Sequence, residues 1–196
     1  MFKTINGGKM PTRGSKYSAC VDLFSNEDVT IGAGETKLIP LGVAIDEDKF
    51  YEDFNNYYSL VNSTKDIELE FSRIFSSHYL QLMLRSSLSK ELIIANGVGV
   101  IDLDYKDEIM IRVHNPIKAK GQITMYKGYS GYSSLPDIDD RYVFKFSDDV
   151  EIKKGQRVAQ ITLLEHKGYL FGINTEDERE GGFGSTDKKE VNNGNM

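Results

Sequence analysis

The side chains best able to do chemistry are concentrated between residues 96 and 105, in the run Asn-Gly-Val-Gly-Val-Ile-Asp-Leu-Asp-Tyr. Gly97 and Gly99 allow a tight turn and a close approach of the backbone to a ligand. Asp102 and Asp104 follow on a predicted strand or its turn, and a carboxylate beside open backbone suits a general base. The same residues also fit a plain hairpin in which both aspartates cap turns, and this segment alone favours that interpretation.

Two other segments have the composition of anion-binding loops. Residues 84–89 end a predicted strand with Arg85 and three serines, and an arginine with hydroxyl and backbone donors is a common way to hold phosphate. Residues 179–186 are rich in glycine, whose backbone N–H groups could wrap an anion, and include Phe183, which could stack on a base. Taken alone, the first segment is equally a polar loop and the second a flexible linker, and neither is a Walker or Rossmann motif.

Composition narrows the class of function. A net charge of −6 opposes binding to a nucleic-acid backbone, which needs clustered lysine and arginine. The single cysteine, Cys20, cannot form an internal disulfide or a thiolate cluster, so a metal would be bound through oxygen. No apolar stretch approaches the roughly 20 residues of a membrane span, and the N-terminus lacks a secretory pattern. We therefore expect a cytoplasmic protein without a membrane or nucleic-acid partner.

Short apolar or alternating runs between scattered glycines predict an all-β fold. We expect one domain over residues 1–187 and a loose polar tail over 188–196. In residues 108–114, Ile111 and Val113 alternate with Arg112, which predicts a strand with two distinct faces. The clearest predicted strands cover residues 36–44, 79–84, 108–114, 141–146 and 157–164.

Residues 48–78 differ from the rest of the chain because they contain no glycine or proline. Apolar residues recur there at three- and four-residue steps, which predicts one or two helices packed against the core. The alternative is a helix that binds a partner. The residues that form this stripe are Phe50, Phe54, Tyr57, Tyr58 and Val61.

Taken in order, segments of this chain resemble the five motifs of the homotrimeric dUTPase family. They are residues 18–23 (Ser-Ala-Cys-Val-Asp-Leu), 85–88 (Arg-Ser-Ser-Leu), 96–115, 155–160 (Gly-Gln-Arg-Val-Ala-Gln) and 181–186 (Gly-Gly-Phe-Gly-Ser-Thr). The resemblance implies a jelly-roll-like β-barrel, with C-terminal arms exchanged in a homotrimer whose sites are shared between subunits. It also implies Mg²⁺-dependent hydrolysis of dUTP to dUMP and pyrophosphate.

The resemblance assigns roles to individual residues. Asp102 would activate the water that attacks the α-phosphorus in line. Asp22 and Gln160 would hold Mg²⁺ through its waters. Uracil would lie in a hairpin at residues 96–99. The implied substrate-binding residues are Arg85, Ser86, Ser87, Asn96, Gly99, Tyr105, Gln160, Phe183, Gly184, Ser185 and Thr186. Among these, the Tyr105 ring would pack on the deoxyribose.

The chain departs from the family pattern in several places. The family usually has an arginine five residues before the motif-five phenylalanine, where this chain has Glu178, with Arg179 one position later. Two insertions, at about 47–76 and 116–150, lengthen connections that are short in compact members. The second carries a tyrosine at every third position from Tyr126 to Tyr132, which would suit either a protein partner or a hairpin packed on the trimer.

The sequence is compatible with two other functions. A dCTP deaminase resembles this family but carries a catalytic glutamate ten residues after the motif-three aspartate, where this chain has Arg112. A dUTPase-like regulatory protein would bind its partner through the insertions. The complete set of catalytic residue types favours hydrolysis of dUTP over both.

Overall fold

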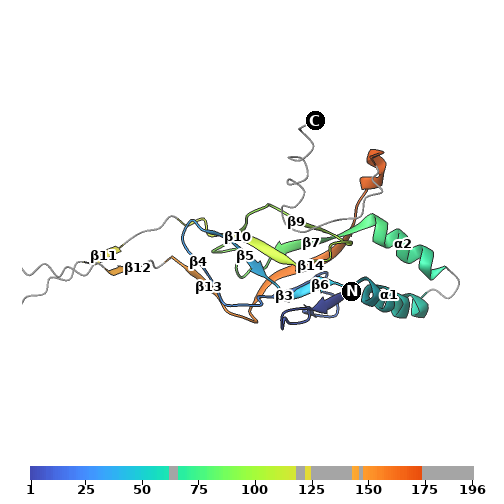
Figure 1. Cartoon of the computed structure of the whole chain (residues 1–196), viewed down its shortest axis with the longest axis horizontal. Helices are drawn as coiled ribbons and strands as arrows, with labels where there is room; N and C mark the ends of the chain where they lie inside the picture. The colour runs from blue at the N-terminus through green and yellow to red at the C-terminus, as the bar shows by residue number, and fades with distance from the viewer. Residues whose placement is uncertain (62–65, 118–121, 125–142, 146–147, 174–196) are drawn as a thin grey trace, which may run out of the picture.

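The computed structural model describes residues 1–61, 66–117, 122–124, 143–145 and 148–173 (Figure 1). Within these ranges the fold is built mainly from short antiparallel strands, which confirms the all-β prediction. The strands are β1 (Phe2–Thr4), β2 (Thr12–Arg13), β3 (Val21–Phe24), β4 (Val29–Ile31), β5 (Thr36–Pro40), β6 (Val43–Ile45), β7 (His78–Leu84), β8 (Ile93–Ile94), β9 (Gly99–Asp102), β10 (Met110–His114), β11 (Gln122–Thr124), β12 (Val143–Lys145), β13 (Val150–Ile152) and β14 (Arg157–Glu165).

The largest sheet has five strands in the order β2-β3-β14-β7-β9. Its central strand, β14, pairs antiparallel with both β3 and β7. A second sheet has the order β5-β10-β8, and three strand pairs, β1-β6, β4-β13 and β11-β12, complete the described part. Motifs that are far apart in sequence therefore meet on neighbouring strands of the largest sheet.

The core lies where the apolar faces of these sheets meet. In β10, Ile111 and Val113 are fully buried whereas Arg112 is exposed, which confirms the predicted two-faced strand. Burying a branched aliphatic side chain stabilises the fold by about 1.5–3 kcal/mol relative to leaving it in water. Other fully buried aliphatic residues are Leu23, Ile31, Ile39, Leu41, Val43, Ile109 and Ile152.

The predicted strand at residues 36–44 is wrong in one respect, because the chain forms two strands there, β5 and β6. Gly42 breaks the run with a φ of 65°, a conformation that favours glycine. Its backbone also approaches Gly8 so closely that a Cβ at Gly8 would lie 2.0 Å from the Gly42 carbonyl oxygen. The Glu108 carboxylate accepts a hydrogen bond from the Gly42 amide at 2.8 Å and fixes this break.

The other predicted strands need smaller corrections. The predictions at 79–84 and 157–164 agree with β7 and β14 to within one residue at each end. Strand β10 begins at Met110 rather than at residue 108. Strand β12 falls inside the predicted 141–146 range, whose remaining residues lie outside the described part, as does most of the proposed 116–150 insertion.

Two helices, α1 (Glu47–Val61) and α2 (Ile67–Ser77), form the predicted helical segment. They lie side by side at one end of the sheets (Figure 1). Phe71 joins them, with its ring centroid 5.1 Å from the rings of both Phe50 and Tyr51. The core interpretation is therefore correct for Phe50. It is wrong for Tyr57 and Val61, which are 66% and 54% exposed.

An ion-pair cluster ties the first residue of the chain to α1. The Met1 amine lies 2.6 Å from the Asp53 carboxylate, and the Lys49 amine lies 2.8 Å from its other oxygen. Lys49 first and the terminal amine second hold the pKa of Asp53 below its usual range. Of the helices described, none is long and apolar enough to cross a bilayer.

Candidate active site

Three of the predicted site residues meet on one face of the largest sheet. Gln160 of β14 lies opposite Asp22 of β3 on one side and Met83 of β7 on the other. Arg85 follows the last residue of β7 and is two positions from Met83, so its side chain emerges on the same face. Nη1 of Arg85 lies 2.7 Å from Oδ2 of Asp22. Residues from motifs one, two and four, which are far apart in sequence, thus lie together in the structure. We call Asp22, Arg85 and Gln160 the arginine cluster.

The Arg85–Asp22 ion pair is partly shielded from water, with side chains 27% and 12% exposed. Nη1 lies at ion-pair distance from the Asp22 carboxylate but makes no hydrogen bond to it. Within the described ranges this buried nitrogen has no hydrogen-bond partner. Buried donors are normally satisfied in folded proteins, so Nη1 is suited to an acceptor from outside the chain, such as a phosphate oxygen.

A tight turn presents two serines beside this arginine. The Arg85 carbonyl accepts hydrogen bonds from the amides of Leu88 and Ser89, at 3.0 and 3.1 Å. The Ser89 hydroxyl donates to the Ser86 carbonyl at 2.9 Å and closes the turn. Ser86 and Ser87 are exposed at its start. The turn therefore exposes two serines that directly follow Arg85 in the chain.

The predicted hairpin at residues 96–99 is wrong as a strand pairing. Strand β8, before this segment, pairs with β10, whereas β9, after it, pairs with β7. The segment is a turn that passes from one sheet to another, and Gly97 has a φ of 72° within it. The exposed Asn96 lies in this turn, and its carbonyl accepts a hydrogen bond from the Val98 amide at 2.8 Å.

Gly99 is needed for close packing against β7. A Cβ at this position would lie 2.8 Å from Cβ of Leu82, nearer than side chains normally approach. A cavity of about 330 Å³ adjoins this contact. It is lined by Leu82, Met83, Leu84, Ser89, Leu92, Ile93, Ile94, Gly97 and Val98. The turn is therefore backed by an apolar hollow.

Asp102 is separated from the arginine cluster within one chain. It is an exposed residue at the end of β9, where it lies opposite Tyr79 at the start of β7. Arg85 follows the other end of β7. Strands rise about 3.3 Å per residue, so the two positions are roughly 20 Å apart. A single subunit therefore does not bring the predicted base to the predicted phosphate-binding group.

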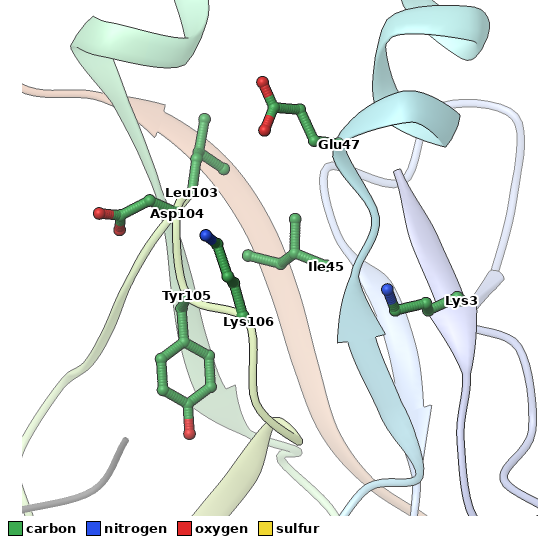
Figure 2. A pocket seen from close by; sticks show the side chains of 7 residues that line it. All are labelled: Lys3, Ile45, Glu47, Leu103, Asp104, Tyr105 and Lys106. Atoms are coloured by element: carbon green, nitrogen blue, oxygen red, sulfur yellow. The ribbon is translucent and has the colours of Figure 1, made fainter. Parts of the chain in front are cut away.

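Tyr105 lies in the loop after Asp102, beside a second cavity of about 410 Å³. Its side chain is 5% exposed, and its hydroxyl donates to the Glu108 carbonyl at 3.3 Å. Figure 2 shows the Tyr105 ring and the amine of Lys106 directed to opposite sides. The loop also closes through a hydrogen bond from the Tyr105 amide to the Asp102 carbonyl at 3.1 Å.

The donor set of the arginine cluster fits Mg²⁺ held through water. Asp22 offers a carboxylate and Gln160 an amide oxygen, and Mg²⁺ prefers oxygen ligands while keeping several of its waters. In the part of the chain that the structure describes, no group of three or more His, Cys, Asp or Glu side chains could hold an ion directly. Water and substrate phosphates would have to complete the coordination.

Arg157 was not among the predicted site residues, although it lies in motif four. Its Nε lies 3.6 Å from Oδ2 of Asp22, the oxygen that also contacts Arg85.

The predicted motif-five residues lie outside the described ranges. They are Phe183, Gly184, Ser185 and Thr186.

Comparison with known proteins finds one family repeatedly. No protein-family model matches the chain. The deoxyuridine 5'-triphosphate nucleotidohydrolase of Rickettsia akari is 27% identical over 187 residues, covering 91% of this chain and 88% of that protein. The mouse protein of the same name is 28% identical over 183 residues, covering 91% and 78%. That of a Psychrobacter strain is 34% identical over 110 residues, covering 54% of each chain.

Solved structures agree in fold. The dUTPase of Streptococcus mutans matches with a TM-score of 0.50 and 20% identity, covering 89% of this chain and 98% of that one. The dUTPase from phage phi11 of S. aureus, whose structure visualises a species-specific insert, matches with a TM-score of 0.55 and 20% identity, covering 94% and 97%. These likenesses support the jelly-roll-like fold, here with a helical segment between β6 and β7.

Proposed function

Because the chain belongs to the dUTPase family, we propose that it hydrolyses dUTP to dUMP and pyrophosphate in the cytoplasm. The observation that carries this proposal is the cluster of Asp22, Arg85 and Gln160 on one face of the largest sheet. A buried guanidinium nitrogen that lacks a hydrogen-bond partner in the described chain supports phosphate binding there. The named relatives match along most of this chain.

In the proposed mechanism, the carboxylate of Asp102 takes a proton from a water molecule that attacks the α-phosphorus in line. Arg85, with the hydroxyls of Ser86 and Ser87, holds the triphosphate and offsets its negative charge. Mg²⁺ on the phosphates would further stabilise that charge and the departing pyrophosphate. Asp22 and Gln160 would hold the ion through its waters.

Selection of the nucleotide would lie in the turn at residues 96–99. Backbone groups there, with the Asn96 amide, would pair with uracil, and cytosine would leave buried polar groups unpaired, a costly mismatch. Gly99 keeps the backbone near the base, and Tyr105 would exclude a ribose 2′-hydroxyl. Phe183 would close over the base. The remaining motif-five residues, Gly184, Ser185 and Thr186, would reach the phosphates.

The active form that we propose is a homotrimer with exchanged C-terminal arms. The separation of Asp102 from Arg85 along β7 supports this arrangement, because a neighbouring subunit could supply the missing group. Beyond β14, the chain also exposes large apolar side chains that association would cover. They are Tyr169, Leu170, Phe171 and Ile173, each 55–85% exposed.

Pyrophosphate release from dUTP, dCTP, dTTP and UTP, with and without Mg²⁺, tests this function directly. We expect hydrolysis of dUTP alone and only with the metal. Asp102→Asn should lower kcat by at least about 100-fold, since general bases contribute about 10²–10⁴. It should leave binding of a nonhydrolysable dUTP analogue within about twofold.

Asp107→Asn is the matched control, because it removes a carboxylate from an exposed loop position near Asp102. Its activity should equal that of the unaltered chain. Near-normal hydrolysis by the Asp102→Asn variant would show that another group is the base. Release of ammonia from dCTP would instead favour a deaminase, although the exposed Arg112 stands where that reaction needs a glutamate.

A further inference from the structure

A β-bulge in β14 brings Arg157 to the arginine cluster. Gln160 and Ala159 lie opposite Asp22 and Leu23 of β3, but the register then shifts and Arg157 lies opposite Phe24. In an unbroken strand, residues 157 and 160 would point to opposite faces of the sheet. The extra residue reverses that relation, since Phe24 and Asp22 are two positions apart and share a face. Bulges are enriched beside active sites, where they redirect a side chain.

The bulged residue also holds the backbone of Arg85. The carbonyl of Val158 accepts a hydrogen bond from the Arg85 amide at 3.1 Å, and the Val158 side chain is fully buried. The bulge thus redirects the side chain of Arg157 on the β3 side of β14. On the other side, the regular pairing with β7 continues through Val158 to the main chain of Arg85.

Both arginines contact the same oxygen of one carboxylate. Oδ2 of Asp22 lies 2.7 Å from Nη1 of Arg85 and 3.6 Å from Nε of Arg157. The second distance is an ion-pair distance, too long for a hydrogen bond. Arg157 is also the more exposed cation, with 56% of its side chain accessible against 27% for Arg85. The two contacts therefore differ in strength and in accessibility.

We propose that Arg157 is a positioning residue that keeps the Asp22 carboxylate oriented when a triphosphate engages Arg85. This inference rests on the proposed function. Phosphate oxygens of the substrate compete with Asp22 for Arg85. When they bind Arg85, that arginine offsets much less of the negative charge of Asp22. Arg157 still attracts the carboxylate, so Asp22 remains directed toward the waters of the metal. Without Arg157, Asp22 pairs with Arg85 alone and opposes substrate binding.

The test uses Mg²⁺-dependent binding of α,β-imido-dUTP, measured by calorimetry, beside kcat and KM for dUTP. Arg157→Ala should raise the Mg²⁺ concentration for half-maximal analogue binding by about tenfold, as loss of an outer-shell partner commonly does. KM should rise more than kcat falls. Arg157→Lys should recover most of this loss, since the contact to Asp22 is electrostatic rather than hydrogen-bonded.

Lys153→Ala is the matched control, since Lys153 is an exposed cation before β14 that pairs with Glu151 at 3.3 Å. It should leave the Mg²⁺ dependence unchanged. In the Asp22→Asn background, Arg157→Ala should have no further effect, because Arg157 acts through that carboxylate.

Four outcomes separate the possibilities. An unaltered chain that does not hydrolyse dUTP would overturn the proposed function. An active chain whose Mg²⁺ dependence is unmoved by Arg157→Ala would overturn only the role of Arg157. A full effect of Arg157→Ala in the Asp22→Asn background, or no recovery by a folded Arg157→Lys variant, would also overturn that role.

Discussion

At the residue scale, the arginine cluster could be predicted only in part. Motif order was enough to select Asp22, Arg85 and Gln160, and strand pairing places them on one face. The role of Arg157 could not be predicted, because a register shift leaves no signature in residue spacing. Asp102 was predicted as the base, but its distance from Arg85 depends on which end of β7 each residue adjoins.

Gly99 provides a residue-scale prediction. Gly99→Ala should lower the free energy of unfolding by about 1–3 kcal/mol, because the added Cβ would lie 2.8 Å from Cβ of Leu82 in a packed sheet. Urea unfolding followed by circular dichroism measures this change. Gly97→Asn is the control, since nothing lies within 4 Å of its added Cβ and asparagine tolerates positive φ. Equal losses in the two variants would show that crowding against Leu82 is unimportant.

At the element scale, residue spacing predicted helices α1 and α2 well but not their contacts. The lack of glycine and proline and the apolar period located both helices. The sequence could not predict which apolar residues would be buried. Two short helices share a small interface, and it buries only some of their apolar side chains. Phe50 meets Phe71, whereas Tyr57 lies beyond that contact. Likewise, the break at Gly42 depends on the distant Gly8.

Phe71 provides the prediction at this scale. Phe71→Ala should lower the free energy of unfolding by about 3–5 kcal/mol, because the ring fills the centre of the aromatic contact between the helices. Leu69→Ala, on the same helix and 66% exposed, should change it by less than about 0.5 kcal/mol. Urea denaturation of the two variants measures the difference. A loss below 1 kcal/mol for Phe71→Ala would mean that the helical pair adds little to the fold.

At the scale of the whole molecule, a site divided between subunits can be detected by complementation. If Asp102 and Arg85 of one site come from different chains, every trimer that mixes Asp102→Asn with Arg85→Ala chains holds one complete site. Equal amounts, unfolded and refolded together, should recover about a quarter of the unaltered activity. Each variant refolded alone should stay inactive. The particle should sediment at about three times the 22.1 kDa chain mass.

The mixture of Asp102→Asn and Arg85→Ala chains can also contradict the divided site. Assembly to that mass without recovered hydrolysis would mean that each chain completes its own site, and a stable monomer would contradict the trimer. Assembly could not be predicted from the sequence without the family resemblance. Exposed apolar residues such as Phe171 become evident only when the fold shows that nothing in the described chain covers them.

The contact between Gly99 and Leu82 also constrains how this sequence can evolve. A residue with a Cβ cannot replace Gly99 without crowding while position 82 also carries a Cβ, so glycine at 82 would have to arise first, at the cost of a gap in the interior. The residues at positions 82 and 99 should therefore change together. In a lineage descended from this chain, a side chain at 99 should appear only beside glycine at 82.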